Sequence, residues 1–92
     1  MDNQSVTFKF ANNKENTIII IIEPWAEEIT MPFNSNLTVE IFYEKLGSIE
    51  TISNVLGTQE YFTIWLWKGC RAKLFLDNKD VTPASLSITT PK

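Results

Sequence analysis

Histidine is absent from this 92-residue chain, and cysteine occurs only once, as Cys70. Without histidine, the Ser–His and Cys–His nucleophile pairs, imidazole acid–base catalysis and histidine metal ligands are all excluded. A single cysteine also excludes an intramolecular disulfide and a cysteine-based zinc site. Because no base is present to activate its thiol, we expect Cys70 to be an unreactive, half-buried turn residue.

Glycine is scarce, and so are long apolar runs. The three glycines, Gly47, Gly57 and Gly69, are isolated, so the chain has no glycine-rich phosphate loop. The run Ile18–Ile22 is too short to span a bilayer. The first residues lack the basic start and apolar segment of a signal peptide. We therefore expect a cytoplasmic protein that does not bind membranes.

Basic residues are nearly missing from the middle of the chain. Residues 15–67 contain eight glutamates and one basic residue, Lys45, whereas residues 68–92 contain five basic and two acidic residues. The net charge of the whole chain is −3. An acidic surface repels phosphate backbones, which disfavours nucleic-acid binding. The same charge would steer a basic protein partner toward the middle segment.

The patterns that are present predict an all-β fold. The isoleucine run Ile18–Ile22, closed by Pro24, predicts a strand that is buried on both faces. Glu60–Trp67 is apolar on both faces and predicts a second central strand. Strict alternation predicts half-buried strands at Ser5–Phe10 and Leu37–Tyr43.

The connections complete a set of about seven strands. The polar loop 11–16 predicts that the first two strands form an antiparallel hairpin. Residues 48–58 favour a short strand with an irregular connection, although Ile49, Ile52, Val55 and Leu56 are also spaced like one face of a helix. Further short strands are expected at 26–31 and Ala72–Leu76, a turn at 77–80, and an edge strand at Val81–Ile88.

Together these elements predict that residues 1–92 form one small antiparallel β-sandwich or flattened barrel, with residues 89–92 frayed. Its chemistry is limited to carboxylates and aromatic rings. Glu23, Glu27 and Glu28 lie close in sequence, but a catalytic carboxylate pair needs a deep cleft that a chain this short would struggle to build. A metal site made of these three glutamates is equally disfavoured. We therefore expect no enzymatic activity and no cofactor.

One segment resembles a known family. Ile22–Glu28 (Ile-Glu-Pro-Trp-Ala-Glu-Glu), followed by Met31-Pro32, is similar to small uncharacterised bacterial proteins with a Glu-Pro-Trp-Gly-(Asp/Glu)-Glu segment and a proline turn. Trp65–Trp67, Lys68-Gly69 and Leu74–Asn78 resemble the later strands and turns of that family. The resemblance covers roughly residues 17–80 and departs at position 26, where glycine is usual, and in a longer 48–60 connection. It implies a small β-fold with no established activity.

The chain is also similar in type to immunity proteins of bacterial toxin systems, which are small, often acidic and catalytically inert. Our leading hypothesis is a non-enzymatic protein that blocks a basic bacterial toxin, with a nuclease as the expected class. Trp25, surrounded by acidic residues, is either an interface anchor or a plug that closes one end of the core. The partner-binding residues predicted for this hypothesis are Glu23, Trp25, Glu27, Glu28, Glu40 and Glu44.

Two alternatives stay open. The protein could bind an apolar or sugar ligand through its aromatic residues Tyr61, Trp65 and Trp67. It could instead be a homo-oligomeric accessory protein built on an open strand edge or an apolar sheet face. The sequence is compatible with a monomer or a weak homodimer.

Overall fold

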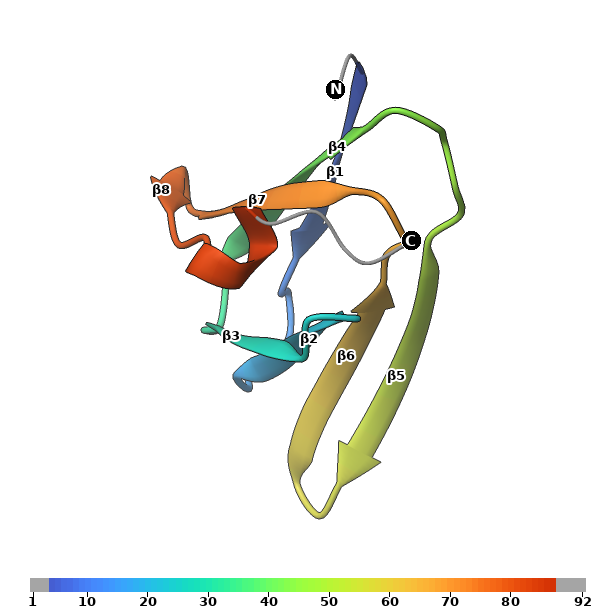
Figure 1. Cartoon of the computed structure of the whole chain (residues 1–92). Coiled ribbons are helices and arrows are strands. Elements are labelled where there is room, and N and C mark those ends of the chain that lie inside the picture. The colour runs from blue at the N-terminus through green and yellow to red at the C-terminus, as the bar shows by residue number, and fades with distance from the viewer. Residues whose placement is uncertain (1–3, 88–92) are drawn as a thin grey trace.

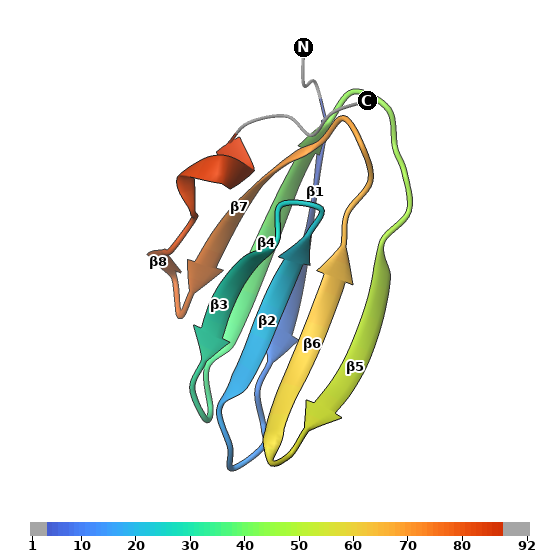
Figure 2. The same ribbon diagram turned by 60° about the horizontal axis from the view of Figure 1, so that its bottom comes forward.

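The computed structural model describes residues 4–87, and it confirms an all-β sandwich of two four-stranded sheets (Figures 1 and 2). Sheet A contains β1 (Gln4–Ala11), β4 (Asn36–Tyr43), β7 (Arg71–Leu76) and β8 (Lys79–Asp80), in that order. Sheet B contains β3 (Glu27–Met31), β2 (Ile18–Glu23), β6 (Gln59–Trp65) and β5 (Glu50–Leu56), in that order. The two sheets form the layers seen in Figure 2, with sheet B in front.

The core lies between the sheets and is built mainly from alternate residues of β2, β3, β4 and β7, with Ile64 of β6. The alternation predicted for Leu37–Tyr43 is confirmed, because Leu37, Val39, Ile41 and Tyr43 are all buried. Sheet B contributes Ile20, Ile22 and Ile64 from its two central strands. Cys70 is fully buried, and its Sγ donates to the backbone oxygen of Trp67 at 2.9 Å.

The isoleucine strand β2 is central in its sheet but is not buried on both faces. Ile20 and Ile22 point into the core, whereas Ile19 and Ile21 lie half-buried on the outer face. The prediction of burial on both sides is therefore wrong for the outer face. A two-layer sandwich has a single core, and no element of residues 4–87 forms a third layer over sheet B (Figure 1).

The predicted hairpin between the first two strands is also wrong. β1 pairs with β4, while β2 pairs antiparallel with β3 and parallel with β6. A short polar loop can close a hairpin or carry the chain from one sheet to the other, and here it does the second. The parallel β2–β6 pair departs from the all-antiparallel prediction, because loop length alone does not specify the neighbour of a strand.

A buried asparagine, Asn12, holds the crossing between the sheets. Its side chain is 1% exposed, and its Nδ2 donates to the backbone oxygens of Asn16, Met31 and Pro32 at 2.9, 3.0 and 3.1 Å. Its Oδ1 accepts from the backbone nitrogen of Lys14 at 3.1 Å. This one amide therefore ties the β1–β2 loop to the β3–β4 turn.

The segment from 44 to 58 forms an open loop and then strand β5, every residue of which is exposed. The helical alternative for 48–58 is wrong, and the short strand is confirmed. Gly57, at φ 64°, turns the chain directly into β6. Trp67 packs next to Gly47, and its Nε1 donates to the backbone oxygen of Lys45 at 3.0 Å.

The last described segment is not the predicted edge strand. After β8, the backbone nitrogen of Val81 still donates to Leu74, but Pro83 is followed by a 3₁₀ turn, η1 (Ala84–Ser87). Leu86 on this turn is fully buried and covers the core beside β7. The predicted turn at 77–80 is tighter than expected, because Asp77 and Asn78 both have positive φ and the next two residues form β8. Residues 89–92, predicted to be frayed, lie outside the described residues.

Candidate protein-binding face

The outer face of sheet B brings together residues from four strands. Strand register places directly opposite residues on the same side of the sheet, so the outward set follows from the pairing. We call this set the Trp65 face; it consists of Glu28, Thr30, Ile19, Ile21, Glu23, Gln59, Tyr61, Thr63, Trp65, Glu50, Ile52, Asn54 and Leu56.

The Trp65 face has an apolar centre. Ile21 and Thr63 are register partners in its middle row, with Ile52 beyond Thr63 on β5. Ile52 is 57% exposed and Trp65 is 41% exposed. Exposed apolar side chains gathered on one face are a feature of interaction surfaces.

Carboxylates border this apolar centre at one end. The register places Trp65 between Glu23 on β2 and Glu50 on β5 in one row across the sheet. Glu28 is directly opposite Ile21, which makes it the diagonal neighbour of Glu23. None of the residues of the Trp65 face is basic. The face therefore has an apolar middle, an aromatic side chain near its edge and an acidic rim.

The outer face of sheet A differs in charge. Lys9, Arg71 and Lys73 lie on it, and both Arg71 and Lys73 lie over the ring of Phe42, at 5.8 and 5.6 Å from the centroid. Glu40 and Asp80 share this face, so it carries charges of both signs, whereas the charged residues of the Trp65 face are all carboxylates.

The structure brings only some of the predicted binding residues together. Glu23 and Glu28 lie on the Trp65 face. Glu27 has the opposite parity on β3, is half-buried, and accepts a hydrogen bond from Ser85 Oγ of η1. Trp25 is half-buried and packs against the core, which fits the alternative of a core plug better than that of an exposed anchor.

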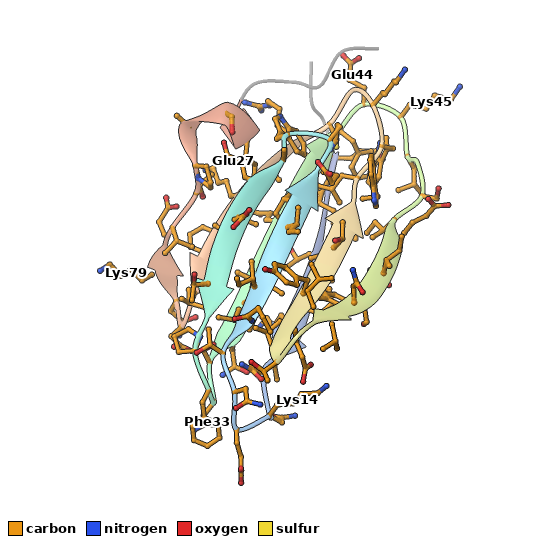
Figure 3. The ribbon with its side chains drawn as sticks, turned by 90° about the horizontal axis from the view of Figure 1, so that it is seen from below. Lys14, Glu27, Phe33, Glu44, Lys45 and Lys79 are labelled. Atoms are coloured by element: carbon orange, nitrogen blue, oxygen red, sulfur yellow. The ribbon has the colours of Figure 1, made fainter. Side chains whose placement is uncertain are left out.

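The remaining two predicted residues lie elsewhere. Glu40 is on the outer face of sheet A, directly opposite Lys73 in the β4–β7 register. Glu44 follows β4 at the end of the sandwich where Glu27 also lies, away from Lys14 and Phe33 (Figure 3). The predicted set of six is thus divided among two faces and one end of the molecule.

Sequence reasoning did not assign Ile19, Ile21, Ile52 or Glu50 to the candidate face. Burial is predicted for Ile19 and Ile21 because their run shows no alternation, and alternation is the usual signal of a solvent-facing side. Ile52 was ambiguous between a helix and a strand. The parity of β6 was informative, since Tyr61 and Trp65 do share a face.

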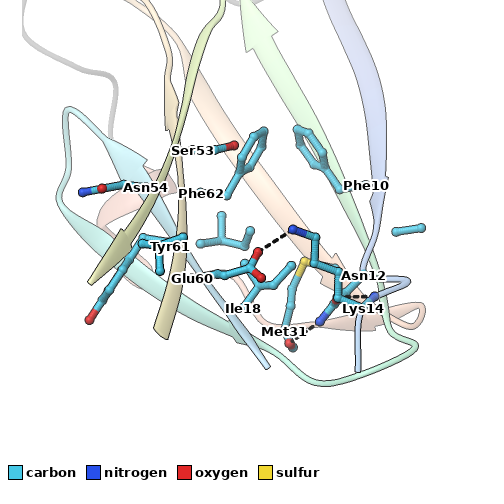
Figure 4. Close-up of a pocket in the computed structure, with 13 residues that line it drawn as sticks. Phe10, Asn12, Lys14, Ile18, Met31, Ser53, Asn54, Glu60, Tyr61 and Phe62 are labelled. Atoms are coloured by element: carbon cyan, nitrogen blue, oxygen red, sulfur yellow. Dashed lines mark hydrogen bonds and ion pairs between the residues drawn. The ribbon is translucent and has the colours of Figure 1, made fainter. Parts of the chain in front are cut away.

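A second feature is a cavity of about 450 Å³ at the open side of the sandwich. Its apolar walls include Phe10 of β1, Met31 of β3, and Val55 and Phe62 of the β5–β6 hairpin (Figure 4). The rings of Phe10 and Phe62 meet edge to face at 5.0 Å between centroids. At its mouth, Lys14 Nζ and Glu60 Oε2 form an ion pair at 2.7 Å.

The aromatic residues predicted to bind a ligand do not converge on this cavity. Tyr61 lines it, whereas Trp65 points outward and Trp67 packs edge to face with Tyr43, 5.5 Å between ring centroids. The sequence did not identify Phe10 and Phe62 as facing partners, because they come from strands of different sheets.

Within residues 4–87, no cluster of three or more acidic or cysteine side chains is arranged to hold a metal ion. No helix in this range has the length and apolar character needed to cross a membrane. Comparison with protein-family models, with curated proteins and with solved structures gives no match for this chain.

Proposed function

We propose that this protein is a non-enzymatic binding protein that uses the Trp65 face to bind a basic protein partner. In its most concrete form, it is an immunity protein that blocks a bacterial toxin, with a nuclease as the expected class. Of the six residues predicted from the sequence, the proposed binding surface keeps Glu23 and Glu28. It adds Glu50 and Trp65, which lie on the same face.

The observation that carries the proposal is the composition of the Trp65 face. Stable interfaces combine an apolar, aromatic centre with a polar rim, and tryptophan is enriched among the residues that dominate binding energy. Here Trp65 is 41% exposed beside Glu23 and Glu50, and no basic residue shares the face. A carboxylate rim without basic neighbours is complementary to lysine and arginine side chains.

A nuclease is a suitable partner for chemical reasons. Its substrate site holds lysine and arginine side chains that bind phosphate oxygens. Carboxylates can accept hydrogen bonds from the same cations, and bidentate contacts with arginine are the strongest of these. In this arrangement Glu23, Glu28 and Glu50 would take the place of phosphates, Ile21 and Ile52 would exclude water from the centre of the interface, and Trp65 would pack against the partner between Glu23 and Glu50.

The partner can be sought with the tagged protein in extracts of the source organism, eluted along a salt gradient. The proposal predicts one stoichiometric basic protein released only at high salt. With that partner in hand, Trp65→Ala should weaken binding by about 30-fold or more, as expected of an interface hot spot. Glu23→Gln combined with Glu50→Gln should lower the association rate and its salt dependence.

Glu40→Gln removes one carboxylate charge from the opposite face and is the matched control for the single variants Glu23→Gln and Glu50→Gln. It should leave affinity within about twofold. If Glu40→Gln weakens binding as much as either single variant, the Trp65 face is not the interface.

A second function is favoured by the cavity between Phe10 and Phe62. Its volume of about 450 Å³ and its apolar walls are in the range of small-molecule sites. We infer that an uncharged apolar ligand is the alternative occupant, because the two charges at the mouth, Lys14 and Glu60, already pair with each other. NMR titration with a panel of fatty alcohols and aromatic compounds tests this, and saturable shifts at both phenylalanines are the expected signal. Shifts confined to the molecular surface would count against it.

A further inference from the structure

The four outer edges of the two sheets are not equally protected against pairing with another strand. β8 is two residues long and charged, and β3 is five residues long, carries two glutamates and is followed by Pro32. β1 is eight residues long, but its charge, Lys9, lies within the strand and not at its first position. Short length, charge and proline each make an edge strand less able to pair with a strand of another molecule. β5 has seven residues, and its only charge is Glu50 at the first position.

β5 also lacks cover from the opposite sheet. Every residue of β5 is exposed, and β6 is the element that it contacts extensively. Figures 1 and 2 show the β5–β6 hairpin extending beyond the side of the sandwich, with no strand of sheet A behind β5. Its large apolar side chains are nevertheless on both of its faces: Ile52 points outward and Val55 inward, at 57% and 58% exposed.

We propose that β5 pairs antiparallel with β5 of a second copy of this chain, joining two copies of sheet B into one continuous eight-stranded sheet. A two-fold axis would pass near Ser53, the midpoint of the strand. Such an isologous contact closes on itself, so the open edge ends in a dimer and not in a growing fibre. This inference concerns self-association and does not depend on the proposed partner, although Ile52 and Leu56 of β5 also belong to the Trp65 face.

The charge distribution selects this arrangement. In an antiparallel pair centred on Ser53, Glu50 of one copy lies opposite Leu56 of the other. The two Glu50 carboxylates are then about 20 Å apart along the strands, which is beyond the Debye length at physiological salt. A parallel pair would place them side by side. The rest of the edge, from Thr51 to Leu56, brings no charge into the contact.

The area available is sufficient for a weak, specific dimer. Ile49, Ile52, Val55 and Leu56, in or next to the edge strand, are between 38% and 62% exposed. If large apolar side chains offer roughly 150 Å² each, these four contribute on the order of 300 Å² per copy. With the strand backbone, the total for two copies approaches the roughly 1,000 Å² at the low end of biological interfaces, which fits a weak dimer.

Sedimentation velocity or light scattering of the purified protein is the direct test, over concentrations up to about 1 mM. We expect a mass that rises toward twice 10.6 kDa with concentration. Ile52→Lys should raise the protein concentration at the midpoint of dimerisation at least 10-fold, because it places two ammonium groups near the two-fold axis of the dimer. Phe33→Lys is the control, since Phe33 is 58% exposed in the β3–β4 turn and lies far from β5 in Figure 3.

Engineered cysteines test the geometry without weakening the interface. Cα–Cα distances across an antiparallel pair match those of a disulfide, and the native Cys70 is buried. Ser53→Cys, nearest the proposed two-fold axis, should give a disulfide-linked dimer under mild oxidation, and Ile52→Cys and Asn54→Cys test whether the axis lies one residue to either side. Thr30→Cys, exposed on the opposite edge of sheet B, should stay at background. A chain that remains 10.6 kDa at every concentration, or equal cross-linking at Thr30 and on β5, would overturn the proposal.

Discussion

The amide of Asn12 offers a sharp test of how the two sheets are held together. Its two N–H groups serve three backbone oxygens, and its Oδ1 accepts a fourth hydrogen bond from Lys14. At about 1 kcal/mol for each of these three hydrogen-bonding groups, the two N–H groups and Oδ1, replacement by alanine should lower the free energy of unfolding by about 3 kcal/mol. For a domain of this size, that is a fall in Tm of about 15 °C.

Replacement by aspartate separates donor chemistry from packing. Asn12→Asp keeps the shape of the side chain but places a carboxylate oxygen within reach of the three carbonyl oxygens that Nδ2 now serves. Because a buried charge facing acceptors is disfavoured, we expect Asn12→Asp to be less stable at pH 7 than Asn12→Ala. Burial would raise the pKa of the new carboxyl, so the folded state would bind its proton first. The deficit relative to wild type should therefore shrink as the pH falls from 7 toward 4.

Urea titrations at both pH values, followed by tryptophan fluorescence, measure these differences. Asn13→Asp is the matched control, because Asn13 is exposed next to Asn12 and the substitution adds the same charge. It should change stability by less than about 0.5 kcal/mol. If Asn12→Asp is as stable as wild type at pH 7, the amide is not the donor that ties the loop to the turn, and the reasoning fails.

Three further substitutions probe local geometry. Gly47→Ala should cost about 1–3 kcal/mol and red-shift tryptophan emission, because its Cβ would lie 2.1 Å from Cγ of Trp67; unchanged stability in thermal melts would contradict this packing. Ala26→Gly should stabilise by about 0.5–1 kcal/mol, since Ala26 has φ 60°, and a lower Tm would refute the left-handed turn. Hydrogen bonds from the Thr82 side chain and backbone lower the pKa of Asp80 below its usual 3.8. The ionised carboxylate therefore stabilises the folded state above pH 3.8, and this stabilisation is lost as the pH falls through the lowered pKa. Thr82→Val should therefore move the Asp80 titration, followed by carboxyl NMR, upward; an unmoved titration would count against the contact.

Much of the fold follows from local patterns. The alternation in Leu37–Tyr43 gave the buried side of β4, and Pro24 correctly marked the end of β2. These predictions succeed because strand period and proline chemistry act within a few residues. Strand pairing depends on residues far apart in the sequence, so the neighbours of β1 and β2 could not be read from the loop between them.

The candidate site was predicted only in part, for a related reason. Clustering of charge along the sequence does lead to Glu23 and Glu28, but adjacent residues of a strand point to opposite sides. Glu27 and Glu28 are consecutive, yet only Glu28 is on the Trp65 face. Asn12 belongs to a polar loop, and nothing in that loop distinguishes the buried amide from its exposed neighbour Asn13.

The path of the chain between the sheets has a consequence for folding kinetics. The strands visit sheet A, then B, then A, then B, then A, so the chain crosses the core four times. β2 and its parallel neighbour β6 are separated by three other strands in the sequence. During synthesis β2 must therefore wait for β6 to fill the position beside it, and sheet A still lacks β7 and β8 when sheet B is complete. Proteins with such non-local strand pairing fold in milliseconds to seconds. We expect unfolding to be a single cooperative transition, because neither sheet is stable without the other.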